Sequence, residues 1–277
     1  MAGSMVLFSM MHGTVRLLSD DIHPFEIAFF RNLFGVLTVA PWFIRYGWEP
    51  LRTKRLSLHL QRGVLNVVAM LMFFSALSLS PIALVQALAF TSPLFATVLA
   101  ILFLKERVGA RRWTAICVGF LGTLIIIRPG VQDIDLGAML TVGSAAIWAA
   151  CLIMIKRLSD TDSAVTITTY MVVVMTPLTG IAAAFVWVTP TWEQLGWLCA
   201  CGVWGTLAQL ITTKSLSMAA ASFVLPLDFT KIIWGALIGY VAFGEVVDGW
   251  TWGGAIIIFV GATYITLRER KLAAQKN

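Results

Sequence analysis

Long apolar runs alternate with short polar breaks along almost the whole chain. A membrane-crossing helix needs about 20 mostly apolar residues, and the pattern predicts ten such segments. Most of the breaks contain proline, glycine or charged residues, which favour loops and helix ends. The predicted spans are residues 2–18, 25–44, 62–79, 82–104, 112–127, 136–155, 165–187, 194–213, 220–243 and 250–267.

The composition also indicates a membrane protein. Charged residues make up 12% of the 277 positions and hydrophobic residues 59%, whereas soluble domains carry about 25% charged residues. This number of charged residues is too small for a surface that faces water on all sides. Lipid must therefore cover much of the protein surface. The net charge is +6, but the basic residues form no continuous basic face with interleaved aromatic residues. Nucleic-acid binding is therefore not expected.

The lysines and arginines predict the orientation. With the N-terminus in the cytoplasm, most of the 20 basic residues fall in cytoplasmic loops and in the basic C-terminal tail. Residues 1–18 have neither a basic leading segment nor a small-residue cleavage site, which favours a first span over a removable signal peptide. We expect a multi-pass protein of a bacterial-type inner (plasma) membrane with both termini in the cytoplasm.

The chain resembles itself at an offset of 139 residues. Phe90-Thr91 then aligns with Phe229-Thr230, Glu106 with Glu245, and Trp113 with Trp252, although shared apolar composition alone produces part of this similarity. The predicted halves, residues 1–130 and 131–277, hold five spans each. Because five is odd, the second half enters the membrane from the opposite side. The pattern predicts an all-α protein with two inverted-topology repeats around a central cavity; the alternative is a duplication with no role in transport.

The segments Phe90–Gly130 and Pro226–Ile265 share a glutamate at a helix end, then a tryptophan and a glycine-containing helix. Together they resemble the signature of the drug/metabolite transporter superfamily, EamA type. Ile232 departs from it, because it stands where Pro93 stands in the first half. The resemblance implies alternating access, with the first, third, fourth, sixth, eighth and ninth spans around the cavity and the fifth and tenth at the periphery.

Two opposite charges, Asp228 and Lys231, lie in the ninth predicted span. Each costs about 2.5–3.5 kcal/mol at a helix centre, and a spacing of three residues places them on one helix face. They form a structural ion pair, or Lys231 meets a substrate carboxylate, or the pair gates the pathway, or Lys231 reaches toward the interface. Pro93 and Pro226 are candidate kinks for gating, because a proline frees a backbone carbonyl, or they shape the bundle statically.

Other polar and aromatic residues within the spans are candidates for the cavity wall. Unsatisfied amides are costly in lipid, so they should face the bundle interior. Arg31 can reach outward to the membrane surface or pair with Glu26 about one turn away. The cavity candidates besides Asp228 and Lys231 are His12, Asn66, Gln86, Phe90, Trp148, Trp204 and Trp234.

The functional prediction is secondary transport of small amphipathic metabolites. The resemblance extends to the YddG-type exporters of aromatic and other amino acids, so amino-acid export is the first expectation. The alternatives are S-adenosylmethionine or riboflavin uptake by another branch, drug efflux, or an assembly role without transport. The sequence contains no catalytic motif, so an enzyme is not expected. We expect no cofactor, no metal site and no ATPase subunit, and a monomer or homodimer in the lipid bilayer.

Overall fold

A computed structural model describes residues 2–47, 51–92, 94–96, 98–99, 110–127, 135–218 and 230–274. Over these ranges the chain forms helices and loops, with no strand. The helices are α1 (Ala2–Leu18), α2 (Pro24–Tyr46), α3 (Leu56–Leu79), α4 (Ile82–Ala89), α6 (Ala110–Ile127), α7 (Leu136–Ser159), α8 (Ala164–Ala184), α9 (Trp192–Met218), α11 (Thr230–Phe243) and α12 (Gly249–Ala274).

The helices begin where the sequence supplies capping groups. Pro24 opens α2, and the His23 ring accepts a hydrogen bond from the Phe25 amide at 3.2 Å. The Asp135 carboxylate accepts from the first amides of α7, and the Ser163 hydroxyl accepts from Thr166 at the start of α8. Each cap satisfies amides that have no partner within the helix, which fixes the first turn.

Among the described helices, four are long and apolar enough to cross a membrane: α3, α7, α8 and the Trp192–Ser215 part of α9. The fourth predicted span, 82–104, is not continuous, since α4 ends at Ala89. The amides of Phe90 and Thr91 bond to carbonyls three residues back. Ser92 is helical again, so the break covers Phe90 and Thr91. Residues 220–229 of the ninth predicted span lie outside the described ranges.

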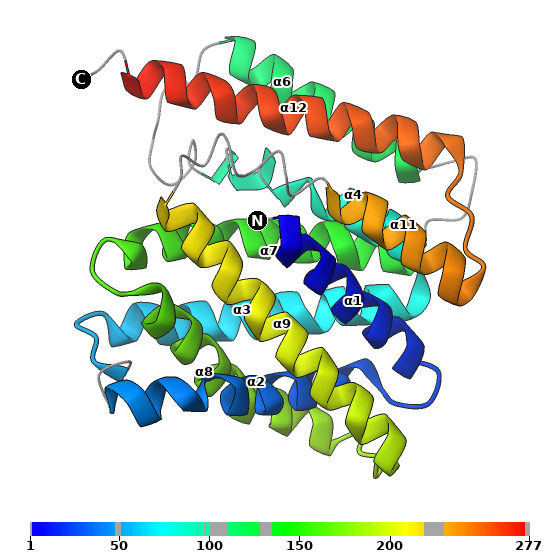
Figure 1. Ribbon diagram of the computed structural model, residues 1–277. Helices are drawn as coiled ribbons and strands as arrows, with labels where there is room; N and C mark the ends of the chain where they lie inside the picture. The colour runs from blue at the N-terminus through cyan, green and yellow to red at the C-terminus, as the bar shows by residue number, and fades with distance from the viewer. Residues whose placement is uncertain are drawn as a thin grey trace.

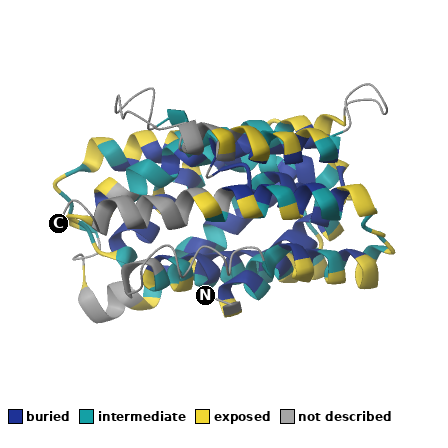
Figure 2. Ribbon diagram, turned by 90° about the horizontal axis from the view of Figure 1, so that it is seen from above, coloured by how far each residue is buried: buried dark blue, intermediate teal, exposed yellow. Residues whose placement is uncertain are grey.

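The helices form a bundle whose long axis runs along most of its members (Figure 1). α3 packs along α7, α2 along α8 and α9, and α1 along α9 and α11. At one edge α12 lies along α6, as Figure 1 shows. Buried residues line the inside of the bundle and exposed residues its rim (Figure 2), the arrangement expected when helices share an interior.

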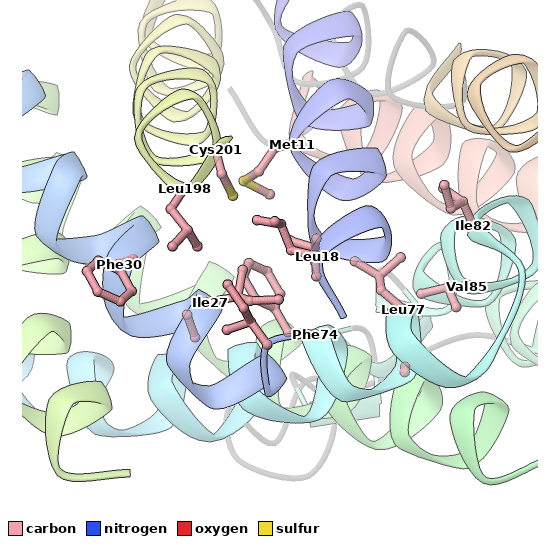
Figure 3. Packing of buried hydrophobic residues seen from close by; sticks show 14 residues of the cluster. Met11, Leu18, Ile27, Phe30, Phe74, Leu77, Ile82, Val85, Leu198 and Cys201 are labelled. Atoms are coloured by element: carbon pink, nitrogen blue, oxygen red, sulfur yellow. The ribbon is translucent and has the colours of Figure 1, made fainter. Parts of the chain in front are cut away.

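The two ends of the bundle differ in their loops. The end that we call the Arg16 end carries the turns between α1 and α2 and between α3 and α4. The opposite end, the His59 end, carries the turns between α2 and α3 and between α7 and α8. Toward the Arg16 end, large apolar side chains from α1, α2, α3, α4 and α9 fill the interior (Figure 3). This core includes Met11, Leu18, Ile27, Phe30, Phe74, Leu77, Ile82, Val85, Leu198 and Cys201.

Glycines allow α6 and α12 to approach closely. A Cβ on Gly254 would lie 2.6 Å from the backbone oxygen of Gly122 and 2.5 Å from Cγ1 of Ile126. A Cβ on Gly122 would lie 2.9 Å from the oxygen of Gly254. Because backbone atoms cannot move aside as a flexible side chain can, the two helices pack at this distance only with glycine at both positions.

We therefore predict that Gly254→Ala separates α6 from α12 and destabilises the protein by about 1–3 kcal/mol, the usual cost of overpacking. The measurement is thermal unfolding of the purified protein in detergent. Gly253→Ala is the matched control, because a Cβ there meets nothing within 4 Å; it should be neutral or slightly stabilising, since alanine favours helix. Equal unfolding temperatures for the two variants would contradict this account of the α6–α12 contact.

Candidate functional site

A cavity of about 300 Å³ lies inside the bundle, bordered by α1, α2, α3, α4, α7, α8, α9, α11 and α12. The core toward the Arg16 end closes one side of it, since Met11 and Phe74 belong to both. Ile155 and Thr213 extend its wall toward the His59 end. Ten of the 26 lining residues are phenylalanine, tryptophan or methionine. These side chains are Phe8, Phe73, Phe74, Phe90, Trp148 and Phe259, with Met11, Met70, Met171 and Met175.

Polar side chains interrupt this apolar wall. Two of them are cations, Arg31 on α2 and Lys231 on α11, and no carboxylate belongs to the described part of the lining. The uncharged polar members are His12, Asn66, Gln86, Ser92, Ser144, Gln209, Thr212, Thr213 and Thr263. The cavity therefore offers aromatic surface, hydrogen-bonding groups and a positive field in one space.

A small polar network joins α1, α4 and α11 at the cavity wall. Gln86 Nε2 lies 3.2 Å from His12 Nδ1 and 3.5 Å from Ser9 Oγ, to which it donates. The Ser9 hydroxyl donates to the Lys231 backbone carbonyl at 3.3 Å. Lys231 Nζ lies 4.9 Å from the centre of the Phe8 ring, a distance suited to a cation–π contact. The network holds the start of α11 against α1.

Six of the nine predicted cavity candidates line this cavity: His12, Asn66, Gln86, Phe90, Trp148 and Lys231. Trp204 instead packs against the core cluster, and Trp234 is 37% exposed; neither lines the cavity. Both tryptophans lie on helices that border the cavity, but their side chains project from other sides of these helices. Three other predicted residues, Pro93, Pro226 and Asp228, lie outside the described residues.

Arg31 differs from both expectations for it. Its side chain is buried, and Glu26 uses its Oε2 to accept the Val188 amide at 3.0 Å instead of pairing with Arg31. Arg31 donates from NH1 to Asn32 Oδ1 at 2.9 Å and lines the cavity. α2 packs along α9, and Arg31 lies on the face of α2 that borders the cavity, a position that spacing along the chain did not identify.

The set of helices around the cavity is larger than the resemblance implied. α2 contributes Arg31, α8 contributes Met171 and Met175, and α12 contributes Phe259 and Thr263. Although α12 packs along α6 at the bundle edge, its inner face reaches the cavity. The expectation that the tenth helix is only peripheral is therefore wrong. The six implied helices all take part.

Ion pairs and hydrogen bonds close the Arg16 end across distant parts of the chain. Arg16 Nε lies 3.4 Å from Glu245 Oε1, and the Ile82 amide donates to Glu245 Oε2 at 3.0 Å. Arg16 also donates to the Ser78 carbonyl, and Ser80 bonds to Asp135. These contacts join the turns of the first half of the chain to those of the second.

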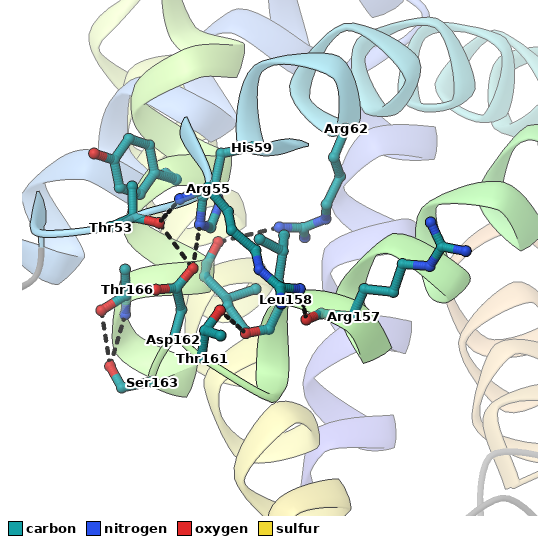
Figure 4. Close-up of polar contacts among 12 residues, drawn as sticks. Thr53, Arg55, His59, Arg62, Arg157, Leu158, Thr161, Asp162, Ser163 and Thr166 are labelled. Carbon is teal, nitrogen blue, oxygen red and sulfur yellow. Dashed lines mark hydrogen bonds and ion pairs between the residues drawn. The ribbon is translucent and has the colours of Figure 1, made fainter. Parts of the chain in front are cut away.

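A second polar cluster stands at the His59 end (Figure 4). Asp162 Oδ2 lies 3.0 Å from His59 Nε2 and accepts from Thr53 Oγ1 at 2.9 Å. Arg55 donates to the Arg157 carbonyl at 2.7 Å. The Tyr170 ring stacks on the imidazole of His59, with centroids 4.4 Å apart. This cluster joins the α2–α3 loop to the α7–α8 turn.

The sequence model of the EamA-like transporter family matches the chain twice, over residues 1–128 and 135–267. The chain belongs to this family. It is a transporter and a multi-pass bacterial membrane protein of the drug/metabolite transporter superfamily, as the resemblance predicted. Among the described residues, no group of three or more His, Cys, Asp or Glu side chains is placed to hold a metal ion.

Three similar proteins are named as transporters of riboflavin or of S-adenosylmethionine. The chain is 36% identical to a riboflavin transporter of Vibrio cholerae, over 91% of this chain and 85% of that protein. It is 31% identical to an S-adenosylmethionine uptake transporter of Rickettsia bellii, over 94% and 90% of the two chains. A riboflavin transporter of Rhizobium johnstonii is 34% identical over 88% of this chain and 81% of its own. These names favour the metabolite-uptake alternative over amino-acid export.

A solved crystal structure shares the fold. It matches 98% of both chains with a TM-score of 0.64 at 17% sequence identity. At this identity the likeness concerns the arrangement of the helices alone.

We predict that Asp162→Ala destabilises the protein by about 1–3 kcal/mol, because His59 and Thr53 lose a buried partner. Thermal unfolding in detergent measures the effect, and Asp160→Ala is the matched control, since Asp160 is an exposed carboxylate two residues away. In a double-mutant cycle, Asp162→Ala should cost less when His59 is already phenylalanine. Fully additive losses would show that the His59–Asp162 contact contributes nothing to stability.

Proposed function

We propose that this protein takes up riboflavin, or a closely related flavin, across the bacterial inner membrane. The observation that carries the proposal is the cavity wall, where aromatic and methionine side chains surround a few hydrogen-bonding groups and two cations. The identity to the riboflavin transporter of Vibrio cholerae supports the same solute.

Riboflavin combines a flat aromatic ring system with a polyhydroxylated chain, and the cavity has surfaces for both. Phe90 and Trp148 offer faces on which a flat ring can stack, and methionine sulfur packs well against aromatic rings. Asn66, Ser144 and Thr212 offer partners for hydroxyl groups. The volume of about 300 Å³ stands at the lower limit of the roughly 300–1,000 Å³ common among small-molecule sites.

Charge favours a flavin over S-adenosylmethionine. S-adenosylmethionine carries a sulfonium, an ammonium and a carboxylate, for a net charge of +1, whereas riboflavin is neutral. Arg31 is not part of either described ion pair and would repel added positive charge in this low-dielectric space. The methionines and phenylalanines suit either solute, so the charge of Arg31 favours the neutral one.

The mechanism that we propose is alternating access between two inverted five-helix halves. The two separate matches to the family model support a chain built of two related halves. The apolar core and the Arg16–Glu245 contact support a state closed at the Arg16 end. With the orientation predicted from basic residues, that end faces away from the cytoplasm, and uptake requires these contacts to break and re-form in each cycle.

Counterflow in proteoliposomes tests the solute, with no ion gradient imposed. We predict that labelled riboflavin accumulates in vesicles preloaded with unlabelled riboflavin, and that S-adenosylmethionine and phenylalanine do not exchange. Exchange of S-adenosylmethionine alone would overturn the riboflavin proposal and identify S-adenosylmethionine as the solute. Exchange of phenylalanine without riboflavin would favour amino-acid export instead.

Two tryptophans provide a matched pair for the same assay. Trp148→Leu removes a stacking face from the cavity, and we predict a rise in KM for riboflavin of about 5- to 10-fold, since an aromatic pair contributes about 1 kcal/mol. Trp204→Leu removes the same side chain from the core outside the cavity, and should lower stability while leaving KM within about twofold of wild type. Equal KM effects would place the solute elsewhere.

A further inference from the structure

The Arg31 guanidinium is a buried charged donor without a full set of partners. Its side chain is 3% exposed, and its Nε is buried with no hydrogen-bond partner. The two ion pairs found among the described residues, Arg16–Glu245 and His59–Asp162, do not include it. A buried cation that lacks hydrogen bonds is costly, and Arg31 borders the cavity. Nε packs against α9 at Gly205 and has almost no accessible surface, so a solute in the cavity can meet only the remaining guanidinium atoms.

The surrounding residues hold this guanidinium in place. Asn32 accepts from Arg31 NH1 and donates to the Ala28 carbonyl at 2.9 Å, so its amide is itself fixed. On the other side stands Gly205 of α9, where a Cβ would lie 2.9 Å from Arg31 Nε and 3.2 Å from its NH2. The space beside Gly205 therefore accommodates the planar head group, and a larger residue there would displace the ends of Arg31 and Met11.

Two acceptors without partners belong to the same cavity. Asn66 and Gln86 line the cavity, and their Oδ1 and Oε1 atoms are buried with no hydrogen-bond partner within the described residues. The wall therefore holds one guanidinium and two amides, each of which has an atom without a partner. A solute that satisfies them must present both acceptor atoms and N–H or O–H donors.

We propose that Arg31 is the specificity-determining residue of the cavity and binds a planar pair of acceptor atoms on the solute. A guanidinium presents its donors as a flat fork that matches two coplanar acceptors. The pyrimidine ring of a flavin offers such a pair, the N1 nitrogen beside the C2 carbonyl oxygen. The flavin N3–H and the chain hydroxyls supply donors for Asn66 and Gln86. This assignment rests on the proposed function and names the part of the flavin that is recognised.

The experiment compares binding of riboflavin and 2-thioriboflavin, in which sulfur, a weaker acceptor, replaces the C2 oxygen. Wild-type protein should prefer riboflavin by about tenfold, the effect of one hydrogen bond to a charged group. Arg31→Met should weaken riboflavin binding by at least about tenfold and reduce that preference to about twofold or less. Arg31→Lys should fall between the two, because it keeps the charge and loses the fork.

A second variant tests position without removing charge. Gly205→Ala should displace the flexible ends of Arg31 and Met11, weaken riboflavin binding and lower the preference over the thio analogue. Arg62→Met is the matched control, since Arg62 is equally buried but donates to the Ile167 carbonyl and does not line the cavity. It should leave the preference between the two flavins unchanged, whatever its effect on stability.

The outcomes separate the two proposals. If wild-type protein binds no riboflavin, the proposed function is overturned, and the assignment of Arg31 falls with it. If wild-type protein binds riboflavin but Arg31→Met and Gly205→Ala keep the full preference over 2-thioriboflavin, the assignment is overturned and riboflavin uptake stands. Size-exclusion profiles confirm that each variant is folded before its binding is compared.

Discussion

Hydrocarbon supplies no hydrogen-bond partner, so every polar group that this bundle buries depends on the protein or its solute for one. Most of them find partners in the chain: Asn32 bonds to Ala28, Glu26 to Val188 and Asp162 to His59. Arg31, Asn66 and Gln86 each keep one polar atom without a partner, and all three residues line one cavity. Arg62 also keeps unpartnered guanidinium atoms, so it is its position at the cavity that distinguishes Arg31.

The same constraint accounts for the asymmetry between the ends of the bundle. Toward the Arg16 end, apolar side chains fill the interior and Glu245 joins Arg16 to the start of α4. Toward the His59 end, the polar cluster around Asp162 joins two loops, and the cavity extends in that direction. A transporter has to exchange such arrangements, and the partly exposed Arg16–Glu245 pair is easier to break than the packed apolar core beside it.

Much of this architecture could be predicted from the sequence because hydrophobic runs and proline or glycine breaks act locally. The starts of α2 at Pro24 and of α12 at Gly249 follow directly from such breaks. His12 and Gln86 could be predicted as interior residues because an amide or imidazole facing lipid is costly. The position of Arg31 at the cavity could not be predicted from the sequence, because it depends on packing against Gly205, which lies on a helix far along the chain. Trp204 and Trp234 failed as candidates for the same reason, because the helix rotation that decides their direction comes from tertiary packing.

The central claim is that the cavity binds a neutral flavin, and an equilibrium titration tests it most directly. Riboflavin is fluorescent, and stacking against aromatic side chains such as Trp148 and Phe90 should quench it. Purified protein added to riboflavin should quench the fluorescence to a saturating level, and S-adenosylmethionine should not reverse the quenching. Quenching that rises linearly without saturation, or that S-adenosylmethionine reverses, would contradict a flavin site in this cavity.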